Sequence, residues 1–144
     1  MAKFSRTSGF TLLELLVVVG VIVFLSTMSL VVFSQVRRLS RDTVRLTHIT
    51  QLQTALRAYF RDQGVYPTAV VAGGSIATTT TTYMELVPAY PRPADGSCAS
   101  GSTYAYTQDS AGASYHINFC LGNMIANVPA GNNILTPAGI ITAP

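Results

Sequence analysis

The chain carries no charged residue from Leu15 to Val36, and most of these 22 residues are apolar. As an α-helix the segment would be about 33 Å long, at about 1.5 Å per residue. The hydrocarbon core of a bilayer is about 30 Å thick, and a helix satisfies its own backbone hydrogen bonds there. The segment therefore predicts a membrane-spanning helix, because the rest of the chain has too little apolar mass to surround it as a core helix.

Two other kinds of membrane-directed segment would have a similar hydropathy. A removable secretory signal peptide would also begin with basic residues such as Lys3 and Arg6. Its apolar stretch, however, is usually about 7–15 residues long and ends in a small-x-small cleavage site, which is missing after this segment. A plain single-pass anchor gives no reason for Glu14, a carboxylate at the edge of the apolar segment, where charged groups are usually functional or paired.

Residues 8–15 read Ser-Gly-Phe-Thr-Leu-Leu-Glu-Leu and lie between a short basic leader and the uncharged segment. This combination resembles the processing site of type IV pilins and of the pseudopilins of type II secretion. The resemblance implies that a prepilin peptidase cleaves between Gly9 and Phe10 on the cytoplasmic side. It also implies that Phe10 is N-methylated and that Glu14 becomes the fifth residue of the mature chain.

The implied cleavage gives Glu14 a physical role. It would create an ammonium group at Phe10, one helical turn from the Glu14 carboxylate, and a neighbouring subunit could offer its own ammonium to that carboxylate. In a low-dielectric helix bundle an unpaired carboxylate is penalised, whereas a paired one is not. We therefore expect Glu14 to favour one axial register during assembly; the alternative is that its side chain reaches the membrane surface.

The helical pattern continues beyond the apolar segment and becomes amphipathic. Apolar residues recur mainly at three- and four-residue spacing from Val36 to Phe60, and no Pro or Gly interrupts residues 21–63. Gly64 is a candidate C-cap. We expect one long helix over about residues 11–63. The resemblance implies an α+β pilin-like fold, in which this N-terminal helix packs on a small antiparallel β-sheet head.

The resemblance also divides the chain. Residues 1–9 would be the cleaved leader, and residues 10–36 the transmembrane and assembly half of the long helix. Residues 37–144 would form an extracytoplasmic domain, with an amphipathic helix at 37–63 and a β head at 64–144.

Within the head, the clearest β signal is a hairpin. Residues 103–108 and 114–120 alternate between apolar or aromatic and polar side chains, and Asp109-Ser-Ala-Gly112 separates them. We expect the hairpin to pack on the helix stripe that contains Leu52, Leu56 and Tyr59. Residues 68–82 read as a loop, residues 83–88 as a short helix or turn, and the tail after Gly122 as the place for one more strand.

Cys98 and Cys120 are the two cysteines of the chain and bracket the hairpin. If the head lies outside the cytoplasm, they can form a disulfide. Such a bond would close a loop of about twenty residues and contribute about 3 kcal/mol. A metal site or a reactive thiol has no supporting ligands nearby in the sequence.

The sequence shows no catalytic constellation and no phosphate-binding loop. His48 and His116 lack the spacing of metal ligands and are best interpreted as surface or packing residues. Asp95 and Asp109 are too sparse to define a calcium site. We therefore expect a protein that is not an enzyme and that needs no cofactor and no metal.

Six arginines lie between residues 37 and 61. Arg37, Arg41 and Arg45 would share one helix face and form a basic ridge. A ridge of this kind could contact nucleic-acid phosphates, but no aromatic residues are interleaved to stack bases. A solvated or headgroup-facing stripe, or one that pairs with acids of neighbouring subunits, is the favoured interpretation.

The leading hypothesis is a structural subunit of a pilus or pseudopilus. The resemblance implies a homo-oligomeric helical filament, a prepilin peptidase, an assembly platform with its ATPase, and membrane lipid as partners. It places the precursor in the bacterial inner membrane and the assembled filament outside the cytoplasm. By number alone, the arginines after Val36 would favour the reverse orientation; the processing motif and the cysteines favour a cytoplasmic leader. The alternative function is a minor or tip subunit, or a membrane-tethered protein that binds DNA, a surface or a secreted substrate.

Overall fold

The structure is a computed structural model that describes residues 10–143, apart from the side chains of residues 28–32. Two compact units divide the chain, Met1–Val36 and Arg37–Pro144, and their boundary falls inside the first helix. We call the second unit the head domain.

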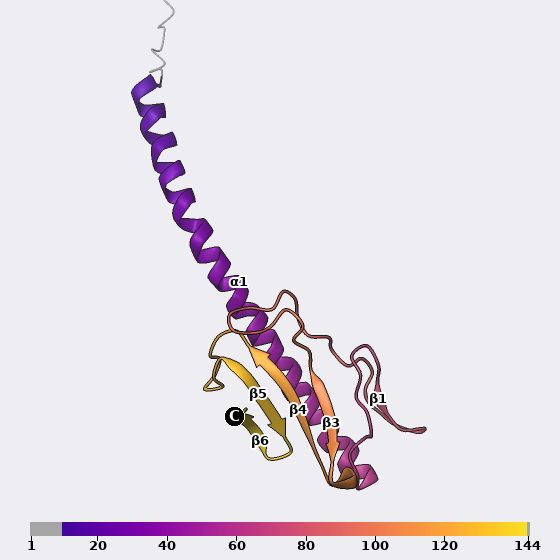
Figure 1. Ribbon diagram of the computed structural model, residues 1–144. Coiled ribbons are helices and arrows are strands. Elements are labelled where there is room, and N and C mark those ends of the chain that lie inside the picture. Colours follow the sequence, from indigo (N-terminus) through magenta and orange to yellow (C-terminus); the bar gives the residue numbers. More distant parts are fainter. Residues whose placement is uncertain (1–9, 144) are drawn as a thin grey trace, which may run out of the picture. The chain divides into compact units, whose positions relative to one another are not determined.

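The described residues form two helices and two antiparallel sheets, which confirms the α+β class (Figure 1). The elements, in chain order, are α1 (Leu12–Gln63), β1 (Ile76–Ala77), β2 (Thr82–Met84), β3 (Ala105–Asp109), the 3₁₀ helix η1 (Ser110–Gly112), β4 (Ser114–Leu121), β5 (Gly131–Thr136) and β6 (Gly139–Thr142). Within the described residues, no helix combines the length and the apolar character needed to cross a membrane.

The larger sheet has the order β3-β4-β5-β6, with every neighbouring pair antiparallel. The expected hairpin is confirmed as β3 and β4, in which Tyr106 lies opposite Ile117 and Asp109 opposite Ser114. The 3₁₀ helix η1 forms the connection between the two strands, and Ser110 and Ala111 adopt positive φ there.

Three expectations for the head domain were wrong in detail. The tail contributes two strands, β5 and β6, where one was expected, because residues 137–138 form a tight turn between them. The Thr-rich segment is not only loop, because β1 pairs with β2 across it. Tyr83 and Met84 belong to β2 and not to a helix or turn, since β-branched and aromatic residues suit an extended chain.

The core of the head domain lies between α1 and the inner face of the larger sheet. Ile49, Leu52 and Leu56 are at most 1% exposed, as are Tyr115 and Ile117 of β4. Alternate residues of β4 enter this core because successive side chains of a strand point to opposite faces. The expected contact between the helix stripe and the hairpin is confirmed for Leu52 and Leu56, while Tyr59 is only partly buried beside them.

Threonines mark an exposed face of α1 within the head domain. Four threonine hydroxyl groups each donate to the main-chain carbonyl four residues earlier in α1, at 2.7–2.9 Å. They belong to Thr43, Thr47, Thr50 and Thr54. This i−4 bonding is a common arrangement for threonine inside a helix.

Candidate functional site

The start of α1 is capped by Thr11. The main-chain N–H of Glu14 donates to Thr11 Oγ1 at 3.2 Å, so Thr11 satisfies one of the free N–H groups of the first turn. Glu14 stands three residues after this cap, where a capping box places Glu or Gln and where the helix dipole favours a carboxylate. The Thr-x-x-Glu pattern signals this cap in the sequence, although the cap was not predicted above.

The candidate cleavage bond lies at the edge of the described residues. Gly9 lies outside the described residues. Phe10 precedes α1, and its side chain is 70% exposed. Glu14 lies in the first turn of α1.

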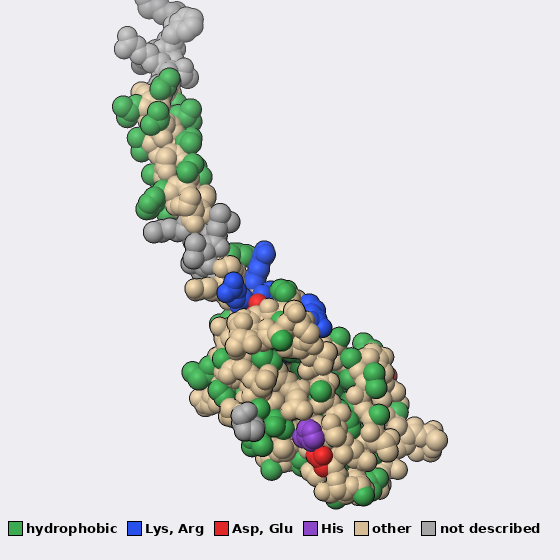
Figure 2. Space-filling view, in the orientation of Figure 1, with side chains coloured by type: hydrophobic (Ala, Val, Ile, Leu, Met, Phe, Trp, Pro, Cys, Tyr) green, Lys and Arg blue, Asp and Glu red, His purple; other side chains and the backbone are tan. Residues whose placement is uncertain are grey.

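Apolar side chains cover the N-terminal part of α1 on all sides. Every residue from Phe10 to Thr27 is exposed, with Leu12 81% and Phe24 62% exposed. Figure 2 shows one face of this part of α1, where hydrophobic side chains are prominent. A helix that is apolar all round is normally buried in a larger core or in a membrane. Continuous apolar surface of this extent marks an interaction site, so we treat residues 10–27 as the candidate assembly segment.

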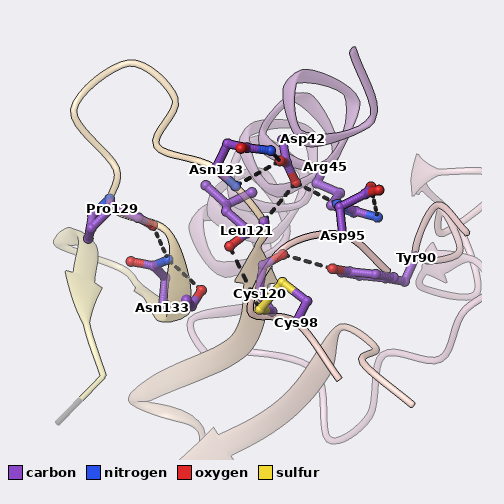
Figure 3. The surroundings of a disulfide bond; sticks show 12 residues. Asp42, Arg45, Tyr90, Asp95, Cys98, Cys120, Leu121, Asn123, Pro129 and Asn133 are labelled. Carbon is purple, nitrogen blue, oxygen red and sulfur yellow. Dashed lines mark hydrogen bonds and ion pairs between the residues drawn. A yellow bond between two sulfur atoms is a disulfide. The ribbon is translucent and has the colours of Figure 1, made fainter. Parts of the chain in front are cut away.

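In the head domain, Cys98 and Cys120 are joined by a disulfide bond, with their Cα atoms 5.7 Å apart (Figure 3). Cys120 belongs to β4, and Cys98 lies in the loop between β2 and β3. The hydroxyl of Tyr90 donates to the main-chain carbonyl of Cys120 at 2.9 Å. The disulfide therefore connects the irregular loop between β2 and β3 to the central part of the sheet.

A buried charged cluster of α1 lies beside this disulfide (Figure 3). We define it as Arg41, Asp42, Arg45 and Asp95. The side chains of Asp42 and Arg45 are fully buried and form an ion pair between neighbouring turns of α1. Buried charges are tolerated only when they are paired and hydrogen-bonded. Asp42 and Arg45 also make hydrogen bonds to the chain near the two cysteines.

Arg45 fixes the loop that leads to Cys98. Its Nη2 atom donates to the carbonyls of Pro91 and Pro93 at 2.8 and 2.7 Å and lies 3.2 Å from Asp95 Oδ2. Its guanidinium also lies over the Tyr90 ring, 4.5 Å from the ring centroid, as in a cation–π contact. Arg45 Nε has no hydrogen-bond partner among the described residues.

Asp42 fixes the segment that follows Cys120. It accepts hydrogen bonds from the main-chain N–H groups of Gly122 and Asn123 at 3.0 and 2.9 Å, and from the Asn123 amide at 2.9 Å. The charge of Asp42 is thus satisfied both within α1 and by the chain after β4.

Arg41 and Asp95 form a two-point ion pair. Arg41 Nε and Nη2 donate to the two Asp95 carboxylate oxygens at 2.7 and 2.6 Å. These hydrogen bonds lower the pKa of Asp95, against the opposing effect of its burial, and the same contact raises the pKa of Arg41. The basic ridge expected at Arg37, Arg41 and Arg45 is therefore wrong for its last two members, which bind acids of their own chain.

Neither histidine belongs to a larger polar site. His116 Nδ1 lies 2.7 Å from Asp109 Oδ2, and His48 Nδ1 lies 3.2 Å from the Tyr104 hydroxyl. Burial lowers the pKa of His48. The described residues contain no group of three or more His, Cys, Asp or Glu side chains that could bind a metal ion. Both carboxylate oxygens of Asp95, which was weighed with Asp109 as a calcium ligand above, accept hydrogen bonds from Arg41.

Comparison of the chain with protein-family models, with curated protein sequences and with solved structures gave no match.

Proposed function

We propose that this chain is a structural subunit of a type IV pilus or of a type II secretion-like pseudopilus. One observation carries the proposal: the pilin-like processing motif at residues 8–15 leads directly into a helix whose described apolar side chains are exposed on every side up to residue 27. A helix of this kind needs partners that cover it, and identical helices in a bundle provide them.

The proposed mechanism begins with removal of residues 1–9 by a prepilin peptidase. The new ammonium of Phe10 then pairs with the Glu14 carboxylate of a neighbouring subunit, while the apolar side chains of residues 10–36 pack together. Pairing removes the penalty of an isolated carboxylate among apolar groups, so it favours a single axial register. The cap that Thr11 provides to the N–H of Glu14 supports this proposal, because it keeps the helix ordered up to its first turn.

In this proposal the subunit is not an enzyme. Its head domain faces outward from the filament, and its uncharged segment roots the precursor in the inner membrane before an assembly platform and its ATPase extract it. Nucleic-acid binding through Arg41 and Arg45 is disfavoured, because both guanidinium groups are engaged by Asp42 and Asp95.

Processing can be tested by mass spectrometry of the protein recovered from cells that contain a prepilin peptidase. We expect a mature chain that begins at Phe10 and carries one added methyl group. Gly9→Val should block cleavage, whereas the matched change Gly20→Val in α1, where the structure leaves open space around the glycine, should not. A protein that still begins at Met1 would contradict the proposal.

Assembly can be tested by imaging filaments sheared from the same cells. We expect Glu14→Ala to reduce filament number at least about tenfold, the equivalent of about 1.4 kcal/mol. Glu85→Ala, which removes an exposed carboxylate of the head domain, should leave filaments at the parent level. Normal assembly of the Glu14→Ala protein would contradict the register role of the carboxylate.

A further inference from the structure

Both cysteines lie near residues that bind the charged side chains of α1. Asp95 stands three residues before Cys98, and the N–H of Cys98 donates to the Asp95 carbonyl at 3.0 Å. Gly122 and Asn123 follow Cys120, and Asp42 accepts hydrogen bonds from both of their main-chain N–H groups. One helix therefore holds two segments that share no hydrogen-bonded strand pairing with each other.

These two segments also touch through their backbones. A Cβ atom added to Gly96 would overlap the Gly122 carbonyl oxygen, and one added to Gly122 would lie 2.6 Å from the Asp95 carbonyl. Gly96 has φ +55°, which side-chain-bearing residues rarely adopt. Two glycines thus allow the backbones of the two segments to come close, and the hydrogen bonds and ion pairs from α1 hold them there. Neither feature requires a bond between the sulfur atoms.

We propose that the charged cluster assembles the two cysteine-bearing segments by itself and so presents Cys98 and Cys120 as a preorganised dithiol for oxidation. In this arrangement the disulfide secures a geometry that α1 has already imposed. All of these contacts lie within the head domain, so the preorganisation does not depend on the proposed filament.

The oxidation itself is a thiol–disulfide exchange with a disulfide-bearing oxidant. The thiolate of Cys98, the less buried cysteine, attacks the oxidant's disulfide, forms a mixed disulfide and releases one thiol. The thiolate of Cys120, which is 3% exposed, then attacks the Cys98 sulfur and releases the second thiol. The pair loses two protons and two electrons, and the oxidant gains both as two thiols.

The experiment equilibrates the folded chain with defined ratios of oxidised and reduced glutathione and measures the oxidised fraction by thiol trapping. The result is the effective concentration of one cysteine relative to the other. Asp95→Asn and Asp42→Asn each weaken a charged hydrogen-bonded contact, so we expect the effective concentration to fall about tenfold or more. Asp109→Asn, which alters the Asp109–His116 contact and none of the contacts of the charged cluster, is the matched control and should change the effective concentration less than about twofold.

Two further measurements separate preorganisation from a general loss of structure. Arg41→Gln changes a partly exposed side chain and leaves the buried Asp42–Arg45 pair intact, so this variant should stay folded by circular dichroism while its effective concentration falls. In a Cys98→Ala, Cys120→Ala protein, the N–H groups of Gly122 and Asn123 should keep their protection from hydrogen exchange. An unchanged effective concentration in Asp95→Asn, or loss of that protection without the disulfide, would overturn the proposal.

Discussion

Asp42 shows how much a single buried charge can depend on its surroundings. Its carboxylate pairs with Arg45 Nη1 and accepts hydrogen bonds from the N–H groups of Gly122 and Asn123, so these three donors lose a partner together if it is removed. Asp42→Ala should therefore lower the free energy of unfolding by about 3–5 kcal/mol, the usual cost of leaving one partner of a buried ion pair uncompensated.

Denaturant unfolding measures this change, with Asp62→Ala as the control. Asp62 pairs with Arg61 at the exposed end of α1, where such a pair contributes about 0–1 kcal/mol. Equal effects of the two substitutions would show that the cluster is not a major source of stability.

Asp95 makes the stability of the head domain sensitive to acid. Hydrogen bonds from Arg41 lower its pKa below the ordinary value of 3.8. The folded state therefore binds its proton at lower pH than the unfolded state does, and the contribution is complete above the unfolded pKa. As the pH falls from about 4 through the folded pKa, the free energy of unfolding should decrease.

The change can be followed by chemical denaturation at a series of pH values. The Asp95→Asn protein should be less stable at neutral pH and should show a shallower decrease in acid. A decrease of the same steepness in both proteins would assign the acid sensitivity to other groups.

Two tyrosines offer a matched test of hydroxyl groups in the same core. The Tyr115 hydroxyl is buried and has no hydrogen-bond partner within the described residues, and burial raises its pKa to about 12. Tyr115→Phe should raise the free energy of unfolding by about 1 kcal/mol, because an unsatisfied buried group is removed. Tyr90→Phe should lower it by about 1 kcal/mol, since its hydroxyl donates to the carbonyl of Cys120. Calorimetric melting temperatures that move in the same direction would contradict this assignment.

At the scale of elements, the β3–β4 hairpin was predictable because its register follows from alternation on two neighbouring segments. The strands β5 and β6 were harder to recognise, since Gly131, Pro137 and Gly139 suggest loop and only their pairing makes them strands. The strands β1 and β2 are too short for any period to show. A local sequence pattern therefore predicts a strand well only where the strand is long enough for the alternation of its side chains to show.

The charged cluster could not be predicted for a different reason. The Asp42–Arg45 spacing in α1 was visible in the sequence, but Asp95 is 54 residues from Arg41 and Gly122 is 80 residues from Asp42. Only the tertiary fold brings them together. The basic ridge was therefore inferred from helix periodicity alone, which says which residues share a face but not what covers that face.

The close approach of the two loops near the disulfide can be tested through glycine. At Gly96 a side chain would meet the Gly122 carbonyl and would also need a positive φ. Gly96→Ala should therefore destabilise the head domain by at least about 1–3 kcal/mol. Gly101→Ala, in the same loop but with open space around it, is the control and should be nearly neutral by thermal unfolding. A neutral Gly96→Ala would show that the two loops separate easily.

At the scale of the whole molecule, the buried core and the charged cluster both belong to the unit Arg37–Pro144. A fragment of residues 37–144 should therefore fold cooperatively. A fragment of residues 46–144 keeps the apolar stripe of α1 but loses Arg41, Asp42 and Arg45, and so leaves Asp95 buried without its partners. It should be less stable by about 3–5 kcal/mol.

Denaturant unfolding compares the two fragments, and sedimentation velocity compares each with the full chain. We expect the fragment of residues 37–144 to be monomeric and the full chain to associate, because only the full chain exposes residues 10–27. Equal stability of the fragments, or a monomeric full chain without detergent, would contradict this division of roles.

The threonines of α1 have a consequence for how the surface of the head domain interacts with water. Because the hydroxyls of Thr43, Thr47, Thr50 and Thr54 already donate to carbonyls of their own helix, each threonine presents mainly a methyl group to its surroundings. By composition this face counts as hydrophilic, yet removal of water from it would leave no hydroxyl donor without a hydrogen bond. In its affinity for water, the face therefore resembles a row of valines more than a row of free hydroxyl groups.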